Sequence, residues 1–272
     1  MITGANRGLG FGLARQLYLA NYPGHVYMGC RDPAKTTDKL LSLRDEAVSR
    51  TQLSCVHLDL SSPQTFGNLK STLEAAGSKL SVLVNNAGIQ YPGQDLSLDR
   101  VKHMMNVNYH GQKELIEFAL NNDLLAPKAK IINVSSMLGT AKAIREPAVK
   151  QKALAISSYE DIESTIEELY ASIRENRRVF SAKALHPLYG FSKYMLNKYT
   201  QLLACDQRIL AGGIEVYAIC PGWVRTDMGG PMATLSVEEG VRAQLHLINK
   251  EGGVDSSIQG KLVVNQRPID VN

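Results

Sequence analysis

Short apolar runs alternate along the chain with longer segments in which apolar residues recur every three or four positions. A short run that is apolar nearly throughout predicts a strand covered on both faces of a parallel sheet. The strand candidates are 25–29, 53–59, 80–85, 130–134, 214–220 and 261–265. Between them the periodicity is helical, and Leu9, Leu13 and Leu17, for example, recur at intervals of four. This alternation predicts an α/β protein of the Rossmann type, with a doubly wound parallel sheet and helices on both faces.

One segment, 141–187, interrupts the alternation with charged residues and a helical period. Within it Ile162, Ile166, Leu169 and Ile173 are spaced by four, three and four residues, so they line one face of a helix. We expect that face to lie on an apolar surface, and the basic run that follows it to be a solvated helix end. Because 272 residues suit one domain, we predict a single domain, 1–272, with a helical insertion at about 141–187.

Composition excludes several classes of protein. With 44% hydrophobic and 21% charged residues the chain can form a globular core, and its net charge of +4 is too balanced for a nucleic-acid binder. No apolar stretch is long enough for a membrane span, and the N-terminus has no signal-peptide pattern, so we expect a cytoplasmic protein without a membrane partner. The four cysteines form no CxxC pair, so neither a metal site nor a disulfide framework is expected.

A glycine-rich turn, TGANRGLG, occupies residues 3–10, where a strand should pass into a helix. Glycines at such a turn let the backbone approach a ligand, and the N-terminus of the following helix favours a pyrophosphate. The turn therefore indicates a pyrophosphate site, although taken alone it could equally be a glycine-rich turn that binds no ligand. Only two residues precede it, so we expect the first strand to be shortened to a stub.

The end of the second predicted strand bears on the choice of coenzyme. An NAD site usually offers an acidic group there to the ribose hydroxyls, whereas this chain reads Gly29, Cys30, Arg31. Arg31, together with Arg7 of the turn, could pair a ribose 2′-phosphate, which favours NADP(H). Two alternatives stay open: either arginine could be a plain surface charge, and the adjacent Asp32 could serve the ribose instead.

Tyr189 and Lys193 are four residues apart, so on a helix they share a face. We expect the ammonium to lower the pKa of the phenol, which could then donate a proton to a carbonyl oxygen as hydride reaches the carbon. The hydroxyl of Ser136 could hydrogen-bond the same oxygen. Taken singly, the tyrosine–lysine spacing could be chance, Ser136 a strand-end hydroxyl and Asn108 a helix cap; taken with the glycine turn, the group favours catalysis.

These motifs resemble the short-chain dehydrogenase/reductase family. The matching segments occur in the family's order: TGANRGLG at 3–10, Asp59-Leu60, NNAG at 85–88, NVNYHG around Asn108, INVSS ending at Ser136, YGFSK at 189–193 and PGWVRTDM at 221–228. The resemblance implies that Tyr189 is the acid/base, that Lys193 also holds the nicotinamide ribose, and that Asn108 holds a water linking Lys193 to solvent. It also implies that the catalytic hydroxyl is the second serine, Ser136, rather than Ser135.

The resemblance further implies where NADP(H) is bound. Asp59 and Leu60 would lie at the adenine, and the loop after the 80–85 strand beside the adenosine ribose. The segment at 221–228 would hold the nicotinamide carboxamide. The implied coenzyme contacts are Gly4, Asn6, Arg7, Gly8, Leu9, Arg31, Asp59, Leu60, Asn86, Ala87, Gly88, Tyr189, Lys193, Pro221, Gly222, Val224 and Thr226.

Ser136 and Tyr189 are 53 positions apart (189 − 136), far more than in most of the family. An insertion here resembles the NADPH-dependent carbonyl reductase branch, to which salutaridine and menthone reductases are similar. That resemblance implies a monomer, because the inserted helix covers the face used for oligomerisation. It implies aldehyde, ketone or quinone substrates under a pocket roofed by Ile89, Met137 and Trp223, although Trp223 could instead be a core aromatic.

Three functions remain to be compared. The first is NADPH-dependent reduction of a small-molecule carbonyl compound to the alcohol. The others are a non-catalytic NADP(H)-binding redox sensor or scaffold and an NAD-linked alcohol dehydrogenase. The complete set of Asn108, Ser136, Tyr189 and Lys193 favours the first, because a protein without turnover has no physical need of all four.

Overall fold

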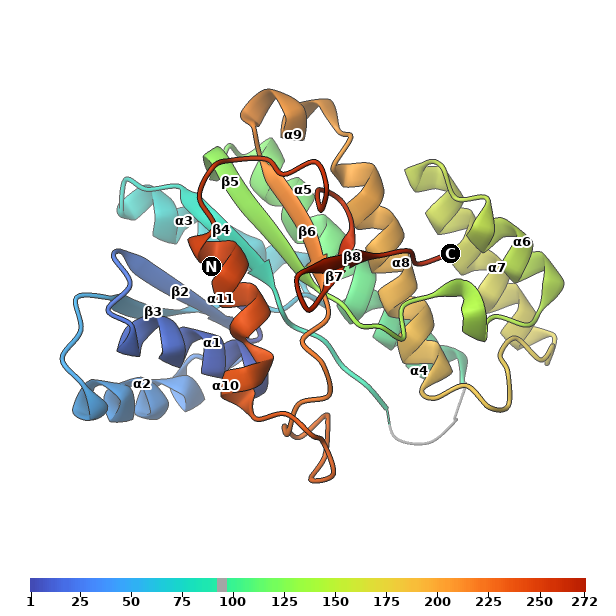
Figure 1. Cartoon of the computed structure of the whole chain (residues 1–272), viewed down its shortest axis with the longest axis horizontal. Helices are drawn as coiled ribbons and strands as arrows, with labels where there is room; N and C mark the ends of the chain where they lie inside the picture. The colour runs from blue at the N-terminus through green and yellow to red at the C-terminus, as the bar shows by residue number, and fades with distance from the viewer. Residues whose placement is uncertain (92–96) are drawn as a thin grey trace.

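The computed structural model describes residues 1–91 and 97–272, which form an eight-stranded sheet between layers of helices (Figure 1). The strand order is β3-β2-β1-β4-β5-β6-β7-β8, with every neighbouring pair parallel except β7 and β8. The strands are β1 (Ile2–Thr3), β2 (His25–Cys30), β3 (Gln52–His57), β4 (Leu80–Asn85), β5 (Leu125–Val134), β6 (Glu215–Ile219), β7 (Leu262–Val264) and β8 (Arg267–Ile269). The strand order reverses between β1 and β4, which is where Rossmann-type sheets bind their ligands.

The six strand predictions and the doubly wound architecture are confirmed. β8 lacks an apolar run because its three residues are exposed at the edge of the sheet, so the sequence pattern does not reveal it. β1 has two residues and pairs with both neighbours, Ile2 opposite Met28 of β2 and Val84 of β4. The Thr3 hydroxyl adds to this pairing because it accepts hydrogen bonds from the backbone N–H groups of Asn86 and Ala87, each at 2.9 Å.

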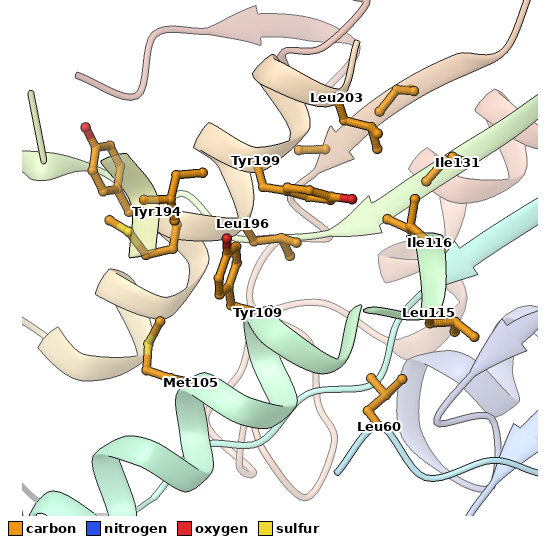
Figure 2. Packing of buried hydrophobic residues seen from close by; sticks show 14 of the residues in the cluster. Leu60, Met105, Tyr109, Leu115, Ile116, Ile131, Tyr194, Leu196, Tyr199 and Leu203 are labelled. Atoms are coloured by element: carbon orange, nitrogen blue, oxygen red, sulfur yellow. The ribbon is translucent and has the colours of Figure 1, made fainter. Parts of the chain in front are cut away.

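Each face of the sheet has its own apolar core. One face packs against α1 (Gly8–Leu19), α2 (Ala34–Glu46), α10 (Val237–Gly240) and α11 (Arg242–Asn249). The other packs against α3 (Phe66–Ala75), α4 (Leu98–Met105), α5 (Gly111–Asn121), α8 (Pro187–Leu203) and α9 (Gln207–Gly212). Figure 2 shows part of this second core, where Leu196, Tyr199 and Leu203 of α8 approach Ile131 of β5. Successive side chains of a strand thus serve different cores, which explains why the runs are apolar throughout.

The region 141–187 contains the 3₁₀ turn η3 (Ala141–Ala143), α6 (Pro147–Leu154) and α7 (Tyr159–Arg174) before α8 begins. α7 lies beside α8 and α6 packs against α7, at one end of the molecule (Figure 1). The predicted apolar face of α7 is confirmed, since Ile162, Ile166 and Leu169 are buried and Ile173 packs partly buried against the same core. A Ser158–Asp161 capping box fixes where α7 starts.

The basic run after α7 is not simply solvated. Arg177 lies 2.8 Å from a carboxylate oxygen of Glu146, 2.9 Å from one of Glu168 and 3.0 Å from one of Glu175. Glu146 also caps α6 by accepting from the Val149 N–H at 2.8 Å. The prediction of a solvated helix end was wrong for Arg177, because folding brings it against Glu146 at the start of α6.

Nothing in the described parts of the chain suggests a membrane span or a metal centre. Across residues 1–91 and 97–272, no helix combines the length and the apolar character needed to cross a bilayer. The same residues contain no group of three or more His, Cys, Asp and Glu side chains arranged to hold a metal ion.

The buried apolar face of α7 should contribute to the free energy of unfolding. We expect Ile166→Ala to lower the free energy of unfolding by about 2–5 kcal/mol, because it leaves a cavity against α8. Glu167→Ala, at an exposed position of the same helix, should change it by less than about 0.5 kcal/mol. Urea denaturation of the two variants checks this; equal effects would contradict the packing of α7.

Candidate active site

The glycine turn lies at the carboxyl end of β1, against the loop that follows β4. Gly4 has φ +62°, and a Cβ there would be 2.9 Å from the Ala87 Cα, so a side chain is excluded. The Asn86 amide donates to the Thr3 carbonyl at 2.8 Å and fixes this approach. α1 starts at Gly8 with Arg7 as its N-cap residue, and that cap makes no side-chain hydrogen bond to the helix end. The turn therefore presents a helix N-terminus at the sheet's switch point, as a pyrophosphate site requires.

α8 carries Tyr189 and Lys193 on one face. Pro187 occupies its first turn, where a missing N–H costs nothing. Lys193 is 2% exposed; its Nζ donates to the Val134 carbonyl at the end of β5 (2.8 Å) and lies 5.7 Å from the centre of the Tyr189 ring. An ammonium has three protons, so this lysine can bind further acceptors in the cleft.

Burial does not give Tyr189 the lowered pKa that its spacing from Lys193 predicts. Burial raises the pKa of Tyr189 well above its ordinary value of 10, and burial lowers the pKa of Lys193 to about 8. The prediction of a lowered phenol pKa was wrong, because desolvation of the phenolate is the main effect on Tyr189. Tyr189 is therefore neutral at pH 7, which is the protonated form that a general acid needs.

Asn108 lies in a π-helical turn, η2 (Asn106–His110), between α4 and α5. Its Oδ1 accepts from the Ile89 N–H at 2.8 Å, and its Nδ2 donates to the Ile89 carbonyl at 2.9 Å and to Ser192 Oγ at 3.0 Å. A Cβ on Gly88 would lie 3.4 Å from Asn108 Oδ1 and 3.5 Å from Lys193 Nζ. Asn108 is thus not a helix cap; it stands beside Lys193, with Gly88 next to both.

The two serines after β5 differ in accessibility. Ser135 is buried and its hydroxyl donates to the Lys193 carbonyl at 3.4 Å. Ser136 is half-buried, and its Oγ accepts from the Leu138 N–H at 3.1 Å. A hydroxyl that accepts in this way keeps its own proton for another group. The geometry therefore favours Ser136 over Ser135 as the hydroxyl available to a ligand.

Several cations surround the outer end of the turn. Arg31 is exposed after β2, while Asp32 lies 3.1 Å from Lys35 and accepts from the Lys35 N–H, which lowers the pKa of Asp32. This pairing weakens the alternative in which Asp32 serves a ribose. Lys39 of α2 donates to the Asn6 carbonyl at 2.7 Å. Lys39 could not be predicted from the sequence, because its closeness to the turn depends on how α2 packs.

The remaining predicted adenine and ribose residues lie at the ends of β3 and β4. Asp59 Oδ1 accepts from the N–H and the hydroxyl of Ser61, at 2.9 and 2.7 Å, and Leu60 is buried. The Gln112 amide holds the Ala87 carbonyl at 2.9 Å. Hydrogen bonds thus hold both segments in place, and the loop at Ala87 lies against Gly4 of the glycine turn.

The segment after β6 approaches the same turn from the other side. Pro221 is followed by Gly222 with φ +82°, Val224 is buried, and the Thr226 methyl would lie 3.5 Å from a Cβ on Gly8. Leu9, the second residue of α1, is half-buried and packs against the same apolar core as the rest of that helix. An exposed ion pair between Arg7 and Asp227 (3.0 Å) links the two segments.

The expected pocket residues are accessible. Trp223 is 54% exposed with its Nε1 donating to the Gly229 carbonyl (2.9 Å), so the interpretation as a core aromatic was wrong. Met137 is 57% exposed, and Ile89 is partly buried. The structure adds a contact that spacing could not reveal: Gln90 Nε2 lies 2.8 Å from His186 Nδ1, which joins the β4 loop to the start of α8.

The fold and the site together define a Rossmann-type α/β protein with a nucleotide-binding turn and, at one end of its sheet, a half-buried tyrosine next to a buried lysine. The family profile described as short chain dehydrogenase matches residues 1–148. The NADPH carbonyl reductase 1 of Mus musculus is 30% identical over 281 residues, which cover 97% of this chain and 96% of the relative. The chain belongs to the short-chain dehydrogenase family.

Solved structures agree in fold. An NADPH-bound carbonyl reductase from chicken fatty liver superposes with a TM-score of 0.72 at 25% identity, covering 98% of this chain and 96% of the other. Salutaridine reductase from Papaver somniferum superposes with a TM-score of 0.81 at 23% identity, covering 96% of this chain and 97% of the other. The resemblance to the carbonyl reductase branch is confirmed.

The buried ammonium should affect stability in a pH-dependent way. Lys193 keeps its proton in the unfolded chain up to about pH 10.5 but loses it near pH 8 when folded. Between these values the unfolded state binds more protons, so the stability of the native protein rises with pH. Relative to Lys193→Met, the wild type should gain unfolding free energy from pH 7 to pH 9.5. Denaturation at the two pH values measures this; a constant or falling difference would contradict the burial of the charge.

Proposed function

We propose that this protein reduces a carbonyl compound, an aldehyde, ketone or quinone, to the alcohol with NADPH. The observation that carries the proposal is the pairing of Tyr189 with the buried Lys193 beside Asn108, at the end of the sheet where the glycine turn lies. Relatives of nearly the same length named as NADPH carbonyl reductases support the same chemistry.

The residues present suit NADP(H). A backbone that tolerates no Cβ at Gly4, the N-terminus of α1 and the cations Arg7, Arg31 and Lys39 match a pyrophosphate and a ribose 2′-phosphate. Lys193, with protons left after its bond to Val134, suits the hydroxyls of the second ribose. When bound, NADPH supplies a hydride to the carbonyl carbon.

Tyr189 supplies the proton in this proposal. Because burial keeps its phenol neutral, the hydroxyl can donate to the carbonyl oxygen as negative charge develops there. Ser136 donates a second hydrogen bond to that oxygen and stabilises the charge. Lys193, still protonated below about pH 8, stabilises the phenolate left behind. Asn108 orders the solvent path by which the proton is replaced.

The proposal extends to the pocket and the setting of the protein. The substrate would lie against Ile89, Met137 and Trp223. The exposed indole of Trp223 and the exposed thioether of Met137 suit an apolar carbonyl compound. We infer a monomer, in which the insertion at 141–187 covers α8, and a cytoplasmic location. The four free cysteines suit a reducing compartment.

Removal of one hydroxyl tests the proton donor. Tyr189→Phe should lower kcat by about 10²–10⁴-fold while NADPH still binds, measured by NADPH absorbance with a quinone or an aromatic aldehyde. Tyr194→Phe is the matched control on the same helix, since its hydroxyl donates to the Ala153 carbonyl at 2.9 Å. Retained activity in Tyr189→Phe would overturn the assignment, and wild-type NADPH binding without turnover would favour a redox sensor.

Charge reversal at the end of β2 tests the choice of coenzyme. Arg31→Asp should raise the KM for NADPH by about 10–100-fold, since a charge-assisted hydrogen bond contributes roughly 1.5–3 kcal/mol. It should not raise the KM for NADH, because a carboxylate at this strand end can accept hydrogen bonds from the ribose hydroxyls. Arg44→Asp, an exposed change on α2, is the control for net charge. An equal loss with both coenzymes would contradict 2′-phosphate recognition by Arg31.

A further inference from the structure

Side-chain hydrogen bonds hold the π-helical turn that carries Asn108 on two sides. A turn of this kind is rare and less stable than an α-helix, so it persists only where other groups hold it. On the inner side the Asn108 amide makes both hydrogen bonds to the backbone of Ile89. On the outer side the next residue, Tyr109, donates from its hydroxyl to Glu163 Oε1 at 3.1 Å.

Glu163 belongs to α7, within the segment we interpret as an insertion. Its Oε1 also accepts from Lys113 Nζ of α5 at 2.6 Å, so one carboxylate oxygen joins the turn and the helix that follows it. His110 lies 3.7 Å from Oε2, and burial lowers the pKa of His110, so this imidazole is neutral at pH 7. The charged partner of Glu163 is therefore Lys113.

The hydrogen bond from Tyr109 to Glu163 affects the position of Asn108, because the Tyr109 ring is closely packed and the two residues are adjacent in the chain. The ring is 0% exposed and packs edge-on against Tyr199 of α8, with 6.2 Å between ring centres. Figure 2 shows Tyr109 between Met105 and Leu196, close to Tyr199. Burial and the Glu163 carboxylate raise the pKa of Tyr109 far above its usual range, so its hydroxyl remains a donor.

We infer that Glu163 is a positioning residue for the reaction: through Tyr109 and Lys113 it keeps the turn at 106–110 in its π-helical form and Asn108 beside Lys193. Without the carboxylate, the turn can relax toward an α-helix, whose different register would turn Asn108 away from Ile89 and Ser192. The insertion then does more than cover α8, because it completes the active site. This inference rests on the proposed function, since Asn108 matters to catalysis only if the protein turns over a substrate.

Steady-state kinetics with NADPH and a quinone tests the inference. Glu163→Ala and Tyr109→Phe should each lower kcat by about tenfold and leave both KM values within about twofold, because neither residue is placed among the substrate or coenzyme contacts. Glu163→Gln retains an oxygen that accepts from Tyr109 and Lys113, so it should keep most of the wild-type kcat. Glu167→Ala, exposed on the same helix, is the matched control.

Amide hydrogen exchange gives a second readout that does not need turnover. In Glu163→Ala, exchange should quicken at 106–110 and at Ile89 while α8 remains as protected as in the wild type. Unchanged exchange there, a wild-type kcat in folded Glu163→Ala, or a loss that merely follows the fraction of NADPH-binding protein would each overturn the inference. Quickened exchange in a protein whose wild type shows no turnover would support the hold on the turn and overturn the proposed function instead.

Discussion

Burial of the Lys193 ammonium at the carboxyl end of the sheet is the constraint on which the site depends. The Lys193 side chain is 2% exposed, and the Val134 carbonyl accepts one of its protons at 2.8 Å. Burial lowers its pKa to about 8, because one hydrogen bond replaces only part of the hydration of a charged amine. The group is thus left in need of further acceptors. In the proposed reaction, a coenzyme ribose and a transient phenolate at Tyr189 would be these acceptors.

The fold brings this amine and its neighbours together from elements far apart in the sequence. The strand order reverses between the paired strands β1 and β4, and there Thr3 joins the glycine turn to the loop at Asn86 by hydrogen bonds. From the second core, α8 supplies Tyr189 and Lys193, and the π-helical turn supplies Asn108. The segment at 141–187 packs on α8 and reaches Tyr109 through Glu163. The site is therefore supported by both the sheet and the insertion.

What could be predicted from the sequence was local. Strands such as 80–85, the glycine turn and the spacing of Tyr189 and Lys193 are each determined within a few residues, and the structure places them as expected. The direction of the phenol's pKa was not predictable from spacing, because it depends on how completely Tyr189 is desolvated. Three contacts join segments that are distant in the chain, and no periodicity encodes them: Lys39 with Asn6, Arg177 with Glu146, and Gln90 with His186. The edge strand β8 could not be predicted from the sequence, because its exposed residues form no apolar pattern.

The central claim is that the hydride and the phenolic proton move in the same step. Isotope effects on kcat/KM measure this most directly, with NADPH deuterated at the transferred hydrogen and with H₂O replaced by D₂O. The account predicts that each substitution slows the reaction and that deuterated coenzyme leaves the solvent effect undiminished. A solvent effect that is absent, or that shrinks with deuterated NADPH, would show that the proton arrives in a separate step and would contradict the account.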